Sequence, residues 1–114
     1  MQVTRRISWI NGARRAFDAF PSDVQTDVLD ALTIAADGGK SGKAKPLSGF
    51  VGGVFEVALK HRGDAYRAVY ALKVGDDLWV IHAFQKKSKS GIKTPQSEID
   101  LIRGRLKWLR EALR

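Results

Sequence analysis

Residues 54–87 read VFEVALKHRGDAYRAVYALKVGDDLWVIHAFQKK, and this stretch decides the fold. Apolar and β-branched side chains recur through it and are interrupted by two Gly-Asp pairs, Gly63-Asp64 and Gly75-Asp76. Glycine at the first central position of a two-residue loop is typical of a type II′ hairpin turn. The stretch therefore predicts three antiparallel strands joined by two tight turns.

Two-residue loops also predict which residues lie opposite one another. Pairing Arg62 with Ala65 across the first turn places Lys60 opposite Arg67. The second turn places Arg67 opposite Phe84 on the third strand. A three-residue loop at either turn would move Arg67 relative to these neighbours.

Side chains along a strand point alternately to the two faces of a sheet. One predicted face is almost wholly apolar and is the expected core face, with Phe55, Val57, Leu59, His61, Tyr66, Ala68, Tyr70, Leu72, Val74, Trp79, Ile81, Ala83 and Gln85. The other face gathers basic and aromatic side chains around a single acid, Glu56, and they are Lys60, Arg62, Arg67, Lys73, His82, Phe84 and Lys86. This second face suits a phosphate-bearing polymer, or it is the solvated face that antiparallel sheets usually have. The pattern alone leaves both interpretations open.

Composition narrows the functional class. The chain has 114 residues, and we expect one domain that spans 1–114. Twenty Lys and Arg against twelve Asp and Glu give a net charge of +8, which favours anionic partners such as nucleic acid. The sequence has no cysteine and two histidines, so we expect no disulfide, no metal site and no cofactor. It shows no membrane span and no secretory signal, so we expect a cytoplasmic protein.

The segments before residue 54 predict a strand over 2–10, a short helix over 13–20 and a second helix. That second helix begins at Ser22, which has Gln25 at capping-box spacing, and it ends at Gly38-Gly39. Together they predict a helical hairpin on the apolar sheet face.

Two further segments complete the chain. Residues 38–53 are rich in Gly, Ser and Lys, and we interpret them as a flexible connection, since they lack the spacing of a phosphate-binding loop. Thr94 as N-cap and Pro95 at the first helical position predict a last helix. Its apolar stripe favours docking on the core over lying at a membrane surface.

Five short motifs, in this order, carry a resemblance to a known family: KPLSG (45–49), GVFEV (53–57), AYRAVY (65–70), HAFQKK (82–87) and KTPQSEI (93–99). The chain resembles the RelE/ParE superfamily of bacterial toxins, and most closely its HigB-like, phage-associated branch. The resemblance implies an α+β fold, in which an N-terminal strand and a helical hairpin pack on an antiparallel sheet with a C-terminal helix. It also implies the toxin of a type II toxin–antitoxin system, which cleaves mRNA, commonly on the ribosome. The expected partner is a cognate antitoxin, of helix-turn-helix type and encoded beside it.

The same resemblance indicates the site residues. The family's strand arginine falls on Arg67, and its basic pair falls on Lys86 and Lys87. The expected catalytic residues are Arg67, Lys86, Lys87 and Lys60, and the expected RNA-binding residues are Arg62, His82, Phe84, Lys89, Lys93 and Lys45. Some members carry a C-terminal tyrosine near the site, but this chain has none after Tyr70, so the general acid stays open. The ParE branch implies an alternative, an inhibitor of DNA gyrase, and a plain basic nucleic-acid-binding domain is a third possibility.

The chemistry of RNA cleavage gives these residue types their roles. Attack by the 2′-hydroxyl needs a base, positive charge at the phosphate and an acid for the leaving 5′ oxygen. Arg67 suits the second role, because a guanidinium stays charged and grips phosphate oxygens in pairs. Lys86 would be pushed toward its neutral form by basic neighbours. His82 is either an acid or base or a structural residue, and Phe84 either stacks on a base or covers the sheet.

Overall fold

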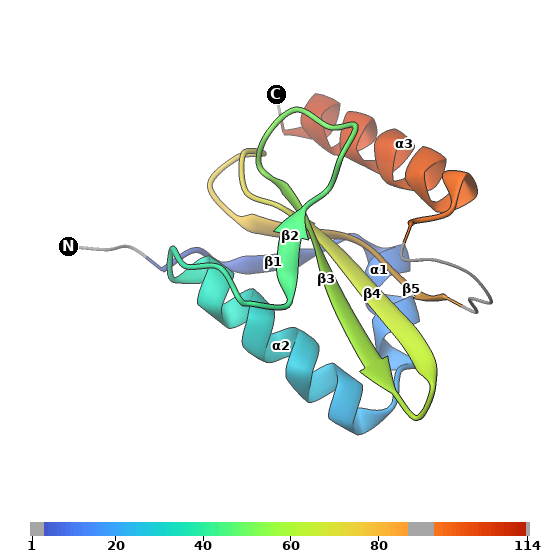
Figure 1. The fold of residues 1–114 in the computed structure, drawn as a ribbon. Coiled ribbons are helices and arrows are strands. Elements are labelled where there is room, and N and C mark those ends of the chain that lie inside the picture. The colour runs from blue at the N-terminus through green and yellow to red at the C-terminus, as the bar shows by residue number, and fades with distance from the viewer. Residues whose placement is uncertain (1–3, 87–92, 114) are drawn as a thin grey trace.

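The computed structural model describes residues 4–86 and 93–113, which form five strands and three helices (Figure 1). Their bounds, in chain order, are β1 Ile7–Trp9, α1 Asn11–Asp18, α2 Ser22–Ala36, β2 Ala44–Pro46, β3 Val54–His61, β4 Asp64–Ala71, β5 Leu78–Lys86 and α3 Gln96–Ala112. The α+β class and the expected order of strand, helical hairpin, three-stranded meander and C-terminal helix are confirmed. In the described ranges, no helix has both the length and the apolar character needed to cross a membrane.

The five strands form one mixed sheet in the order β1-β5-β4-β3-β2. The meander β3-β4-β5 is antiparallel, as predicted, and β1 joins the outer side of β5 in parallel. The interpretation of 38–53 as a plain connection is wrong in one part, because Ala44–Pro46 forms β2, which pairs antiparallel with β3. This pairing sets Lys45 opposite Glu56.

The sheet is covered on both faces, so the fold has three layers (Figure 1). On one face, α1 and α2 bury the predicted apolar side chains of the meander, including Val57, Tyr66 and Tyr70. On the other face, Ile102, Leu106 and Leu109 of α3 pack on a second cluster with members from β3, β4 and β5. The second face is therefore not a solvated surface throughout. Among the described residues, the buried polar side chains are Glu56, Arg67, His82 and Lys86.

A β-bulge divides β5 between the two cores. The register skips from Val69↔His82 to Tyr70↔Val80, so Ile81 has no partner on β4. Beyond the bulge the alternation reverses: Leu78 and Val80 join the core under α1 and α2, while Trp79 and Ile81 face α3. The predicted placement of Trp79 and Ile81 on the first face is therefore wrong, and Val74 likewise lies in the α3 core. A prediction that assumes strict alternation cannot locate the extra residue of a β-bulge.

The first hairpin turn lies one residue earlier than predicted. His61 pairs with Asp64, which leaves Arg62 and Gly63 as the loop residues, with φ angles of 50° and 86°. Two positive φ angles are typical of a type I′ turn rather than type II′. Consequently Lys60 lies opposite Ala65 and not Arg67, whose partner on β3 is Ala58. The shift in pairing between β3 and β4 equals two residues, so the side chains of these two strands keep their predicted faces.

The second connection is longer than predicted, since β4 ends at Ala71 and β5 begins at Leu78. Arg67 nevertheless lies opposite Phe84, as expected. The two predicted helix caps are wrong: Pro21 and Pro95 occupy the N-cap positions, and neither makes a side-chain cap bond. Gln25 instead donates to backbone carbonyls of α1 and the residues after it. Gly38, with φ 97°, ends α2 as expected.

Candidate functional site

A buried ion pair lies at the centre of the face that α3 covers. Arg67 Nη1 on β4 lies 3.7 Å from Glu56 Oε1 on β3, with side chains that are 9% and 1% exposed. The Thr94 hydroxyl, two residues before α3, donates to Glu56 Oε2 over 2.7 Å. Nε of Arg67 is buried and has no hydrogen-bond partner among the described residues. Because a buried donor without an acceptor is unfavourable, Arg67 retains capacity to bind an added anion.

His82 lies beside this pair and is held on both ring nitrogens. Its Nε2 lies 3.1 Å from Glu98 Oε1, and Arg105 Nη1 lies 3.1 Å from its Nδ1. A guanidinium can only donate, so Nδ1 accepts and Nε2 carries the proton. Burial lowers the pKa of His82, with Arg105 acting in the same direction, and Glu98 opposes both. The ring stacks on Phe84 with centroids 5.1 Å apart. His82 thus has the contacts of a neutral, positioned imidazole.

Lys86 at the end of β5 is 7% exposed, although it is a lysine. Burial lowers its pKa, and the charges of Arg67 and Lys45 lower it further, while Glu56 raises it. The charges of these three residues therefore act on the Lys86 ammonium. A lowered pKa makes the neutral, proton-accepting form of a lysine more accessible than it is in a free side chain. The structure brings together Lys45, Glu56, Arg67 and Lys86.

A cavity of about 440 Å³ opens beside this cluster, between the β2 segment and the first turns of α3. Its size lies within the range of ligand pockets. Its lining is rich in polar groups and in Gly and Ser: Lys45, Pro46, Leu47, Ser48, Gly49, Glu56, Lys93, Thr94, Gln96, Ile99 and Arg103. Arg103 is itself fixed, because it donates to the Gly49 carbonyl over 3.3 Å and lies over the Phe50 ring. The exposed lysines 45 and 93 flank the opening with positive charge.

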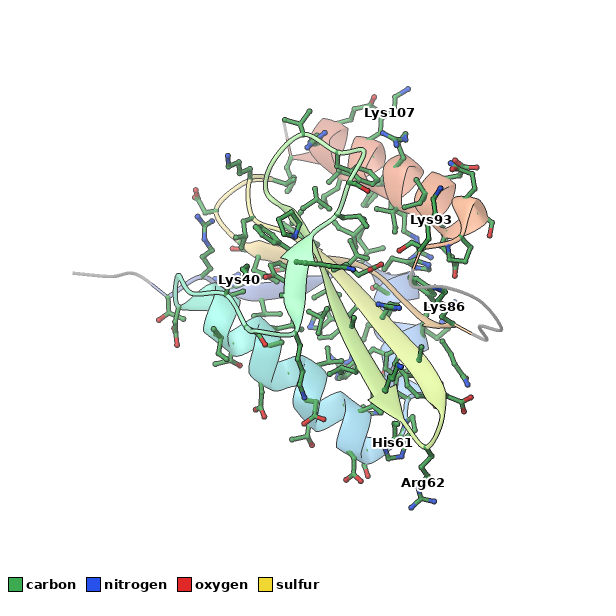
Figure 2. The ribbon with its side chains drawn as sticks, in the orientation of Figure 1. Lys40, His61, Arg62, Lys86, Lys93 and Lys107 are labelled. Carbon is green, nitrogen blue, oxygen red and sulfur yellow. The ribbon has the colours of Figure 1, made fainter. Side chains whose placement is uncertain are left out.

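The remaining expected site residues lie elsewhere. Arg62 is in the loop at the tip of the β3-β4 hairpin and points away from Lys86 and Lys93 (Figure 2). Lys60 is exposed on the same hairpin, across Ala65 from Lys86. Lys87 and Lys89 lie outside the described residues.

The sequence did not predict the three residues that hold Glu56 and His82 in place, which are Thr94, Glu98 and Arg105. A signal was available for Glu56, which is the only acid on an otherwise basic sheet face and so predicts a cationic partner. Within the described ranges, no three His, Asp or Glu side chains gather closely enough to hold a metal ion.

The fold and this site define a class: a small α+β protein with a RelE-like fold and a cationic cluster under its C-terminal helix. Among solved structures, the chain is similar to a chain of the toxin–antitoxin complex RelBE2 from Mycobacterium tuberculosis. The TM-score is 0.52 at 18% identity, over 77% of this chain and 98% of that chain. A family model described as phage derived protein Gp49-like (DUF891) matches residues 15–107. The chain therefore belongs to the Gp49-like family. A comparison with curated proteins finds no match.

Proposed function

We propose that this protein is the toxin of a type II toxin–antitoxin system and that it cleaves mRNA without a metal ion. Membership of a phage-derived family and a fold shared with a chain of a toxin–antitoxin complex support the toxin role. The motifs quoted above favour the HigB-like branch. The same proposal includes a cytoplasmic location, action on ribosome-bound messages and a cognate antitoxin.

The observation that carries the nuclease proposal is the cluster of Lys45, Glu56, Arg67 and Lys86 beside the 440 Å³ cavity. Positive charge fixed in a partly desolvated site stabilises the charge that develops on an attacked phosphate. Lys45 and Lys93 at the opening would guide the RNA backbone, because both are exposed and cationic. Arg67, whose guanidinium retains an unpartnered Nε, would bind the scissile phosphate.

Lys86 is the proposed proton-transfer group. Its pKa is lowered by burial and by Arg67, so its neutral form is reached at a lower pH than for a free lysine. Neutral Lys86 takes the 2′ proton, and the resulting 2′ oxygen attacks the phosphorus. The bond to the 5′ oxygen then breaks, and that oxygen takes a proton from solvent, which leaves a 2′,3′-cyclic phosphate on one fragment and a 5′-hydroxyl on the other.

Glu56 holds the Arg67 guanidinium in position in this scheme. Its carboxylate holds the guanidinium 3.7 Å away, and Thr94 holds the carboxylate. A phosphate can bind Nε of Arg67, which has no partner among the described residues, while Glu56 stays beside Nη1. Glu56 is therefore a positioning residue, which keeps Arg67 in the site when RNA is absent.

Brief induction of the protein in a bacterial host tests the proposal. New RNA 5′ ends inside translated messages should appear before growth stops, and Lys86→Ala should reduce them by about 100-fold or more. Lys107→Ala is the matched control, because Lys107 is an exposed lysine on α3 outside the cavity, and it should cut like the parent (Figure 2). Intact messages after induction of the parent would refute the nuclease.

One observation favours a second candidate, a non-catalytic inhibitor of DNA gyrase. His82 has both ring nitrogens engaged, by Glu98 and by Arg105, so this titratable group is satisfied without a substrate. A supercoiling assay with gyrase separates the candidates. Blocked supercoiling together with uncut messages would establish the inhibitor.

A further inference from the structure

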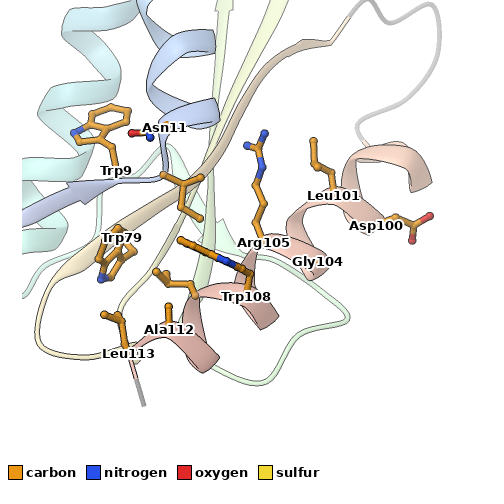
Figure 3. Close-up of a pocket in the computed structure, with 12 residues that line it drawn as sticks. Trp9, Asn11, Trp79, Asp100, Leu101, Gly104, Arg105, Trp108, Ala112 and Leu113 are labelled. Atoms are coloured by element: carbon orange, nitrogen blue, oxygen red, sulfur yellow. The ribbon is translucent and has the colours of Figure 1, made fainter.

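Two arginines of α3 line two different cavities, and their guanidinium groups make different contacts. Arg105 lines a groove of about 600 Å³ between α3 and the ends of β1 and β5 (Figure 3). Its Nη1 donates to the Ile81 carbonyl and to Nδ1 of His82, so this guanidinium attaches α3 to the sheet. Arg103 instead lines the cavity of about 440 Å³ to which Glu56 also contributes. Of the two arginines, Arg103 is therefore the one at the proposed RNA site.

The Arg103 guanidinium is held in one orientation, although the residue is exposed. Its Cζ lies 4.5 Å from the centroid of the Phe50 ring, and its Nη1 donates to the Gly49 carbonyl over 3.3 Å. Gly49 has a φ angle of 89°, a conformation that favours glycine, and this turn brings its carbonyl to Arg103. Among the described residues, Arg103 makes no other hydrogen bond and no ion pair. Nε and Nη2 thus remain as two neighbouring donors in a fixed plane.

The same cavity has apolar surface on both of its sides. Pro46 belongs to β2 and Leu47 follows it, while Ile99 comes from the first turn of α3. Proteins bind an unstacked nucleobase by packing apolar groups on its faces and by hydrogen-bonding its polar edge. A phosphate is charged on every side and gains nothing from apolar walls. Apolar walls together with two fixed donors therefore suit a base better than a phosphate.

We propose that this cavity holds the base of a nucleotide next to the scissile phosphate and that Arg103 selects guanine. Guanine presents two neighbouring acceptors, O6 and N7, and the fork of an arginine bonds both at once. Adenine has an amino donor in place of O6, so it would leave one N–H of Arg103 unpaired. Arg103 is then a specificity-determining residue that takes no part in breaking the bond.

The position of Glu56 connects the base site with the phosphate site. Glu56 lines the cavity that Arg103 lines, and its carboxylate lies 3.7 Å from Nη1 of Arg67. A base at Arg103 and a phosphate at Arg67 can therefore belong to one RNA strand. The inference rests on the proposed function in taking the ligand to be the RNA that this protein cuts.

The first measurement is cleavage of a pool of short RNAs with randomised sequence, read by sequencing the new 5′ ends. The parent should cut about tenfold more often where guanine stands at one fixed position relative to the cut. Arg103→Lys keeps the positive charge and loses the fork, so it should cut at a similar total rate without this preference. Lys107→Ala is the control and should keep the preference, because Lys107 is an exposed cation of α3 that does not line this cavity.

The second measurement is binding, which does not depend on cleavage. The probes are four 2′-O-methyl oligonucleotides of uracil that differ in one central base: guanine, adenine, cytosine or uracil. They have no free 2′-hydroxyl and therefore stay uncut. The parent should bind the guanine probe about tenfold more tightly than the other three, and Arg103→Lys should bind all four alike.

The outcomes separate this inference from the proposed function. A parent that cuts RNA without a guanine preference overturns the inference and leaves the nuclease standing. A preference that Arg103→Lys retains also overturns it, as does an equal loss of cleavage at all four bases, which would assign Arg103 to a phosphate. If the parent cuts no RNA but binds the guanine probe preferentially through Arg103, the nuclease fails and the base site stands.

Discussion

The hydroxyl of Thr94 donates a 2.7 Å hydrogen bond to the buried carboxylate of Glu56, thirty-eight residues earlier in the chain. This bond ties the start of α3 to the middle of the sheet, at the point where Arg67 meets Glu56. It explains why threonine stands there without acting as the helix cap. Thr94 and Glu56 both line the cavity beside α3.

Thr94→Val should therefore destabilise the protein, because it keeps the size of the side chain and removes a donor from a buried carboxylate. We expect a loss of about 1–3 kcal/mol in the free energy of unfolding, measured with urea. Thr26→Val on the exposed side of α2 is the control and should change stability by less than about 0.5 kcal/mol. Equal effects of the two variants would mean that the Thr94 bond contributes nothing.

Arg67→Ala should abolish growth inhibition and should also lower stability. The sequence alone predicts that removing a charge from a basic face leaves the fold unharmed. The structure changes this expectation, because Glu56 is 1% exposed and would lose its cationic partner. The double variant Glu56→Gln, Arg67→Gln removes both charges together and should regain part of the stability without regaining toxicity. Melting curves beside a plating assay measure the two effects, and a toxic double variant would remove Arg67 from the site.

Protein stability should fall as the pH drops below 6.5, because of His82. Burial holds the pKa of His82 below its usual 6.5, so between the two values the unfolded chain binds a proton and the folded protein does not. The contribution of His82 to the free energy of unfolding is therefore fully present above pH 6.5, and it declines as the pH falls toward the pKa of the folded protein. Urea unfolding at several pH values should show this decline in the parent and in His61→Gln, and a smaller decline in His82→Gln. A decline of the same size in His82→Gln would assign it to other groups.

The pH dependence of RNA cleavage should report Lys86. Since its folded pKa is lowered from 10.5, the neutral form becomes populated below that value, and cleavage should rise with pH until that pKa is passed. Lys86→Arg keeps the positive charge but cannot lose a proton at these pH values, so it should lose the rise together with most of the activity. Single-turnover cleavage rates on a short RNA, measured over a range of pH, give this profile for the parent and for Lys86→Arg. An unchanged pH profile in Lys86→Arg would exclude Lys86 as the base.

Gly12→Ala should destabilise the protein by about 1–3 kcal/mol, because the added methyl would displace the Arg105 guanidinium from its bonds to the Ile81 carbonyl and to His82. Gly104→Ala should instead stabilise the protein by about 0.5–1 kcal/mol, because it strengthens α3 and meets no neighbour. Both changes exchange the same two residue types within helices, so each serves as the control for the other. Thermal unfolding that moves in the same direction for both would contradict the packing of Arg105 on Gly12.

Much of the fold follows from local pattern in the sequence. Alternation with period two sorted the side chains of β3 and β4 onto their correct faces, and helical periodicity with Gly38 and Pro95 located α2 and α3. These features depend on sterics and burial within a few residues, so the order of residue types in the sequence is enough to predict them. The one predicted pair that spans the last two strands, Arg67 with Phe84, is also present.

The candidate site was decided only by tertiary structure. Because the first turn is of type I′, Lys60 lies opposite Ala65 and not opposite Arg67 as predicted. Because of the bulge at Ile81, side chains of β5 contribute to both cores. The docking of α3 then brought Thr94, Glu98 and Arg105 onto Glu56 and His82. Sequence could indicate that Arg67 and Lys86 belong to one basic face. Their burial and the lowered pKa of Lys86 arise from contacts between segments far apart in the chain, whose energies depend on distance and desolvation rather than on residue order.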